Sequence, residues 1–121
     1  MSEITASKAE FALDLQNAGL DVVDYIPGRV TPPVVIIRSG SPYLTNASIG
    51  HEFILGLELL VVAQTADNEK ATEDLDQLIE DVVNALPAYA TMKGVSTPFA
   101  LDVNNAQYLA ATITTDLEIT L

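Results

Sequence analysis

Acidic side chains recur along residues 68–86 at a spacing that could serve a chemical purpose. Steps of four, three and four residues would place them on one face of a helix, and these residues are Glu69, Glu73, Asp76 and Glu80. Convergent carboxylates can bind a divalent cation, but one helix face splays them apart. Two interpretations remain: a solvated helix face, or a surface that is required to be negative. Glu80 favours the second, because the helix dipole disfavours negative charge near a C-terminus.

Residues for nucleophilic, acid–base or zinc chemistry form no recognisable pattern. His51 is the only histidine and the chain has no cysteine, so an ordinary zinc ligand set is not expected. No G-x-S-x-G sequence offers an activated serine, and the glycines do not form a phosphate-binding loop. We therefore predict that the protein is not an enzyme and has no catalytic residues, no metal site and no cofactor.

The composition favours a single acidic globular domain. The chain has 121 residues, enough for one domain (1–121), and 49% of them are hydrophobic. The net charge is −12, so binding to nucleic acid or to an anionic membrane by phosphate neutralisation is disfavoured. No apolar run approaches the roughly 18 residues of a membrane span, and the start lacks the pattern of a signal peptide.

Two segments have the periodicity of amphipathic helices. Residues 68–86 carry one apolar stripe, and Pro87 is expected to end the helix. The stripe consists of Ala71, Leu75, Leu78, Ile79, Val82 and Leu86. Residues 7–18 form a second candidate, in which Ser7 and Glu10 have the spacing of a capping box and Gly19 follows the C-cap.

The remaining regular segments are expected to be strands. They are residues 21–26, 34–37, 51–64, 95–103 and 106–121, with Asn104-Asn105 as a tight hairpin turn and with loops at 39–50 and 87–94. The order contains no βαβ repeat. We predict an α+β fold with a mostly antiparallel sheet and two helices packed on one face. At about 3.3 Å per residue, strand 51–64 would be long enough to project or to pair with another chain.

Several residues before the long strand are candidates for contacts with a partner. Tyr43 and Leu44 lie in the expected loop, where they could pack onto the core or anchor a neighbouring molecule. Arg29 and Arg38 are two of only five basic residues. They could pair within the chain, or with carboxylates of an identical subunit.

Several motifs together resemble the tail terminator (tail completion) proteins of long-tailed bacteriophages. The residues that carry the resemblance are GLDVVDYIPGRVTPPVVIIR at 19–38, GSPYL at 40–44, HEFILGLELLVVAQTADNEKATEDLDQLI from His51, and YLAATITT from Tyr108. Within the third segment, the matching positions are Thr65, Ala71, Thr72, Leu75, Asp76, Leu78 and Ile79. The resemblance covers most of the chain but includes no catalytic signature.

The resemblance implies a structural virion protein of the tail and neck, assembled in the host cytoplasm. Such a protein forms a hexameric ring that caps the head-proximal end of the tail tube, ends its polymerisation and meets the head–tail connector. DNA would pass through the lumen without specific binding, and an acidic lumen would repel phosphate. We expect Arg29, Arg38, Pro42, Tyr43 and Leu44 to contact subunits or the tube, and the acidic stripe to form a surface or the lumen.

Two alternatives remain. The chain could be another neck or tail protein, either a head–tail connector or a tail tube subunit. It could also be an acidic α+β domain that binds a metal or a small molecule.

Overall fold

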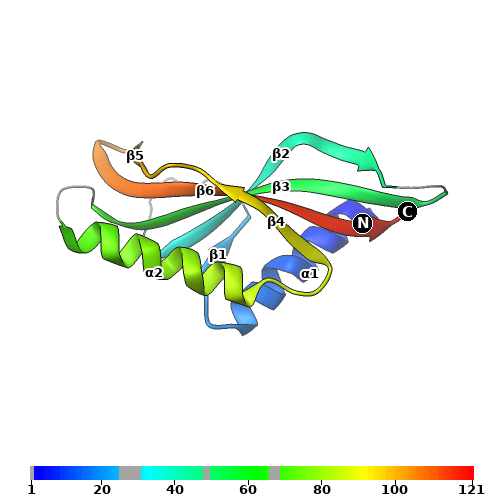
Figure 1. Ribbon diagram of the computed structural model, residues 1–121, viewed down its shortest axis with the longest axis horizontal. Coiled ribbons are helices and arrows are strands. Elements are labelled where there is room, and N and C mark those ends of the chain that lie inside the picture. Colours follow the sequence, from blue (N-terminus) through cyan, green and yellow to red (C-terminus); the bar gives the residue numbers. More distant parts are fainter. Residues whose placement is uncertain (1, 25–30, 48–49, 66–68) are drawn as a thin grey trace.

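A computed structural model describes residues 2–24, 31–47, 50–65 and 69–121 and confirms the predicted α+β fold. The element order is α1 (Glu3–Asn17), β1 (Val22–Val23), β2 (Val34–Asn46), β3 (Glu52–Thr65), α2 (Glu69–Ala85), β4 (Ala90–Val95), β5 (Phe99–Val103) and β6 (Ala106–Thr120). The strands form a single sheet in the order β1-β2-β3-β6-β4, and β5 pairs with the other end of β6 (Figure 1). Among the strands that the structure describes, only the β1–β2 pair is parallel.

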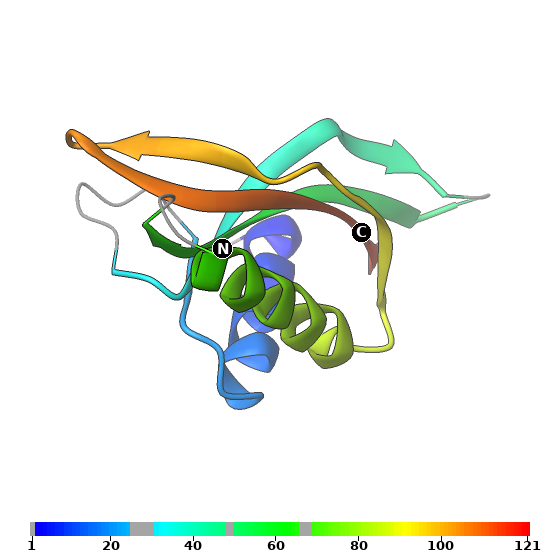
Figure 2. The same ribbon diagram turned by 60° about the vertical axis from the view of Figure 1, so that its left-hand side comes forward.

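Both helices cover the same face of the sheet, as predicted, and the main core lies between the two layers (Figure 2). Phe11 and Leu15 of α1 are fully buried, as is Leu75 of α2. The sheet contributes the side chains that alternate toward this face, among them Leu55, Leu57, Leu59, Val61, Ile113 and Leu117. Because the side-chain period of a strand is two, the intervening residues of β3 and β6 point to the opposite face.

A second, smaller core lies on the face opposite the helices. Its buried members are Val34, Ile36, Leu60, Val62 and Ala110. Phe99, Leu101 and Val103 of β5 pack against them, at the end of the molecule where the β5–β6 hairpin lies. The hairpin turns through Asn104 and Asn105, whose φ angles of 48° and 67° confirm the predicted tight turn. The described members of this small core include no residue from the far end of the face.

Several predicted boundaries were wrong. α1 begins at Glu3, because Ser2 caps it by accepting a hydrogen bond from the backbone N–H of Thr5 at 3.0 Å. Residues 87–94 are not a loop, since β4 starts at Ala90, and the predicted strand 95–103 is divided between the end of β4 and β5. Leu121, at the end of the predicted strand 106–121, lies outside β6 and is 40% exposed.

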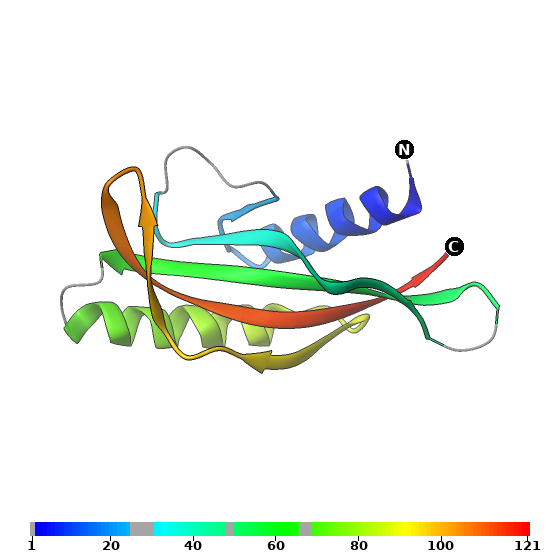
Figure 3. The same cartoon turned by 90° about the horizontal axis from the view of Figure 1, so that it is seen from above.

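The predicted loop 39–50 is largely a continuation of β2, which runs to Asn46. The register shows a large bulge: β2 advances from Ser39 to Leu44 while β3 moves only from Leu57 to Leu55. Beyond the bulge, β2 and β3 continue as a hairpin toward one end of the molecule (Figures 1 and 3). The prediction of one long strand at 51–64 is confirmed by β3, and its pairing with another chain stays a prediction.

Candidate functional site

The bulge of β2 contains the motif Gly40-Ser41-Pro42-Tyr43-Leu44 and depends on a close approach to Gly56 of β3. A Cβ on Gly56 would collide with the Pro42 carbonyl oxygen, and a Cβ on Gly40 would lie 2.9 Å from the Gly56 carbonyl carbon. Gly56 belongs to the face of β3 that is opposite the helices, which we call the helix-free face. The Pro42 backbone therefore arches over the helix-free face. The bulge is thereby fixed by two glycines that are distant in sequence.

The side chains of the bulge divide between the two faces. Tyr43 and Leu44 are half-buried and pack against the main core. The Lys8 Nζ atom of α1 lies 5.5 Å from the centre of the Tyr43 ring, within the range of a cation–π contact. Pro42 and Ser41 are exposed. Of this segment, Pro42 is therefore the more available to a partner, and Tyr43 is in part engaged by α1.

Arg38 and Arg29 were both predicted to contact a partner, and the structure describes only Arg38. Arg38 donates through Nη2 to Glu58 Oε1 at 3.0 Å, and both side chains are about one-third exposed. Arg38 thus has an intramolecular partner on the neighbouring strand. Arg29 lies outside the described residues.

The helix-free face of β3 and β6 carries acidic and hydroxyl side chains beyond the small core. Its residues are Glu52 and Glu58 of β3 with Thr112, Thr114, Asp116, Glu118 and Thr120 of β6. Among the described residues, Arg38 pairs with Glu58, and Lys93 of β4 places its Nζ 3.7 Å from Asp116 Oδ2. These two described cations are outnumbered by the four carboxylates of the surface. The sequence alone did not identify this surface, because it did not show which face of the sheet the helices leave uncovered.

The acidic stripe of α2 lies on the opposite side of the molecule from this face. All four of its members, Glu69, Glu73, Asp76 and Glu80, are exposed, and none of them takes part in an ion pair within the described residues. The last turn of α2 carries no basic residue. In the part of the chain that the structure describes, no three Asp, Glu or His side chains are grouped as metal ligands.

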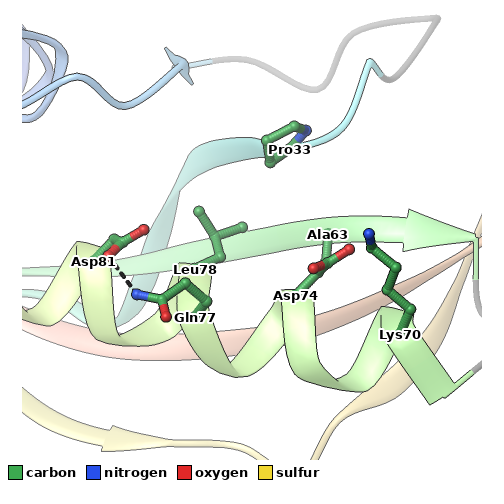
Figure 4. A pocket seen from close by; sticks show the side chains of 7 residues that line it. All are labelled: Pro33, Ala63, Lys70, Asp74, Gln77, Leu78 and Asp81. Atoms are coloured by element: carbon green, nitrogen blue, oxygen red, sulfur yellow. Dashed lines mark hydrogen bonds between the residues drawn. The ribbon is translucent and has the colours of Figure 1, made fainter.

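A hollow of about 320 Å³ lies between α2 and the start of β2 (Figure 4). The residues that line it are Pro33, Ala63, Lys70, Asp74, Gln77, Leu78 and Asp81. Gln77 Nε2 donates to Asp81 Oδ1 at 2.9 Å, and Asp74 Oδ2 is buried without a hydrogen-bond partner. Lys70 and Asp74 are one helical turn apart along the wall, where an i, i+4 attraction is expected. These groups come from one helix face and do not converge on a point.

Tyr89 joins α1 to the segment that leads into β4. Its hydroxyl donates to Asp14 Oδ2 at 2.5 Å, and its ring meets Phe11 edge-on at a centroid distance of 6.5 Å. Burial raises the pKa of the Tyr89 hydroxyl above its ordinary value, and the hydrogen bond to the Asp14 carboxylate raises it further. The Tyr89 carbonyl accepts from the Glu118 N–H at 3.0 Å, so the same residue also starts the β4–β6 ladder.

β4 is the element that sequence reasoning missed. It is an edge strand, and its exposed residues include the large hydrophobic side chains of Met92 and Val95. Edge strands are liable to pair with another chain. The sequence carries no alternation that predicts β4, but residues 82–101 contain no Asp or Glu on a chain that has seventeen.

No protein-family model matches the chain, and no curated protein matches it either. None of the helices described is long and apolar enough to cross a membrane.

Proposed function

We propose that the chain is a tail terminator protein of a long-tailed bacteriophage, which caps the head-proximal end of the tail tube as a ring of identical subunits. The observation that carries this proposal is the sheet with helices on one face only. Such a sheet can separate a packed outer layer from an inner polar surface. The motif Gly40–Leu44, on which the family resemblance partly rests, occupies a bulge that needs Gly56, so motif and fold are consistent.

The ring ends tube polymerisation and joins the tail to the head connector, and DNA passes through its lumen. Two negative surfaces are candidates for the lumen: the helix-free face with Glu118, and the α2 stripe with Glu73. Either would repel phosphate and let DNA slide without binding. A subunit with this role belongs to the virion, in the tail and neck.

Tube capping is tested with tail tube protein from the same phage genome, polymerised with and without the chain. Electron microscopy measures tube length and end density. We expect shorter tubes with extra density at one end, at a ratio of one ring per tube. Tubes whose length and ends are unchanged at every ratio would reject the function. Extra density along the whole tube would instead favour the alternative of a tube subunit.

The lumen is assigned by charge reversal in phage particles. Glu118→Lys on the helix-free face is compared with Glu73→Lys on α2, since both side chains are exposed. The variant whose side chain faces DNA is expected to slow ejection, and more so at low salt because phosphate attraction is screened by ions. Equal ejection rates for both variants and the wild type would reject a role for either surface in the lumen.

A further inference from the structure

The sheet ends on each side in an edge that is partly without a described partner. On one side, β1 pairs with β2 only at Val35 and Ile36, so the outer edge of β2 is open from Arg38 to Asn46 among the described residues. On the other side, β4 and β5 follow one another along the edge, and each pairs only with β6 among the described strands. One chain thus presents two different open sheet edges, which is the requirement for a head-to-tail contact between identical copies.

The distribution of acidic residues marks these two edges. Copies of a chain with a net charge of −12 repel one another. Yet residues 25–51 and 82–101 contain none of the seventeen Asp and Glu residues, and the edges of β2 and β4 fall within them. The described cations of these stretches are Arg38 and Lys93. The two edges are therefore the segments of the sheet at which copies meet with least repulsion.

The β4 edge also directs free backbone groups outward. The Glu118 N–H bonds to the Tyr89 carbonyl and the Ser96 N–H bonds to the Thr112 carbonyl, so Tyr89 and Ser96 point toward β6. Because hydrogen-bonded and non-hydrogen-bonded pairs alternate along an antiparallel ladder, Met92 and Val95 point their N–H groups away from β6. Their side chains are 38% and 39% exposed.

The two edges lie at the same level across the sheet. Cross-strand partners form two rows that link the ends of β4 to β2, and these rows are Ala90–Leu117–Leu55–Leu44 and Val95–Ile113–Leu59–Ile37. A second copy whose β2 lies beside β4 at this level needs little displacement along the strand direction relative to the first copy. A small displacement favours a closed ring over a helical filament. Each step from β2 to β4 is antiparallel, so β4 runs opposite to β2, and a like-oriented neighbour continues the alternation.

We propose that the β4 edge of one subunit pairs antiparallel with the β2 edge, between Arg38 and Asn46, of a second copy of this chain. Repetition of this contact makes one continuous sheet around the ring, with all helices on one side and all helix-free faces on the other. The inference rests on the proposed ring and specifies the contact that builds it. We call this contact between the β4 edge and the β2 edge the joint, and the exposed bulge at Pro42 lies in it.

Proline variants test the joint, since proline removes an N–H and is tolerated at an edge. Met92→Pro and Val95→Pro each remove an outward donor of β4. The matched control is Ala100→Pro on β5, whose N–H also points outward, because the two-residue turn makes Val103 face Ala106 in a hydrogen-bonded pair. Ala100 lies at the end of the sheet where β1 already covers β2. Multi-angle light scattering gives the mass, and circular dichroism confirms folding.

We expect the wild type and Ala100→Pro to form rings, and the two β4 variants to be monomeric or at least tenfold weaker in assembly while still folded. A wild-type chain that stays monomeric at its highest soluble concentration overturns the joint. So do β4 variants that assemble like the wild type. If rings form but do not cap tubes, the proposed function fails and the joint stands.

A cross-linking measurement covers the case in which the β4 variants unfold. The chain has no cysteine, so Thr45→Cys and Thr91→Cys introduce the only two thiols. Thr45 and Thr91 are exposed and lie on the helix-free face near the two edges. A short bismaleimide should give a ladder of covalent multimers that ends at the ring size. The control pairs Thr91→Cys with Glu73→Cys on α2, and an equal ladder from it would overturn the proposal.

Discussion

Replacing Gly56 by alanine tests how the bulge is held. The added Cβ would overlap the Pro42 carbonyl, a backbone atom that cannot move aside as a flexible side chain could. Either β2 shifts away from β3 or the bulge rearranges. Overpacking of this kind costs about 1–3 kcal/mol, and the backbone contact places Gly56→Ala in the upper half of that range. For a domain of this size, we expect the midpoint of thermal unfolding to fall by roughly 6–12 °C.

The assay is urea and thermal unfolding followed by circular dichroism, with Gly94→Ala as the control. No atom lies within 4 Å of a Cβ at Gly94, so alanine there should leave the free energy of unfolding unchanged or raise it by up to about 1 kcal/mol. If Gly56→Ala unfolds within about 0.5 kcal/mol of the wild type, the Pro42 backbone does not lie over Gly56, and the account of the bulge is wrong.

Three further predictions concern the packing of the two helices. Leu75→Ala removes a fully buried side chain from α2 and should cost about 2–5 kcal/mol, measured by urea unfolding. Tyr89→Phe loses the hydrogen bond to Asp14 and should cost about 1–2 kcal/mol at neutral pH. The pKa of Tyr89 is higher in the folded state than in the unfolded state, so this stabilisation is complete below pH 10 and declines as the pH rises above 10. The difference in unfolding free energy between the wild type and Tyr89→Phe should therefore shrink above pH 10. A constant difference up to pH 11 would contradict the hydrogen bond between Tyr89 and Asp14. Ser2→Ala removes the N-cap of α1 and should cost about 0.5–1 kcal/mol. Ser7→Ala should have no comparable effect. If thermal unfolding shows a larger loss of stability for Ser7→Ala than for Ser2→Ala, Ser7 is the cap.

The elements with strong periodicity were predictable from the sequence. α2 has apolar residues at helical spacing, and β6 alternates along nearly its whole length, so burial of one face determines each structure locally. The arrangement of both helices on one face also followed, because two amphipathic helices and one sheet have few ways to bury their apolar sides.

The bulge and β4 were not predictable in the same way. Gly40 and Pro42 are typical of loops, and their strand conformation depends on Gly56, which is distant in the sequence. β4 has mostly exposed side chains and therefore no alternation to detect; its ladder with β6 is what makes it a strand. For the candidate surfaces, the sequence supplied the acidic stripe of α2 but not the helix-free face, because that surface exists only once the helices have packed.

The pairing of β4 with β6 has a consequence for how the protein is made. Domains are synthesised from the N-terminus at about 5–20 residues per second, and β6 leaves the ribosome after the other described strands. Until then, β3 has no partner on its β6 side, and β4 and β5 have no ladder at all. A chain interrupted before Ala106 cannot display the β4 edge. In the proposed ring, only subunits whose translation has passed β6 could join, so the order of the strands itself would exclude unfinished chains from assembly.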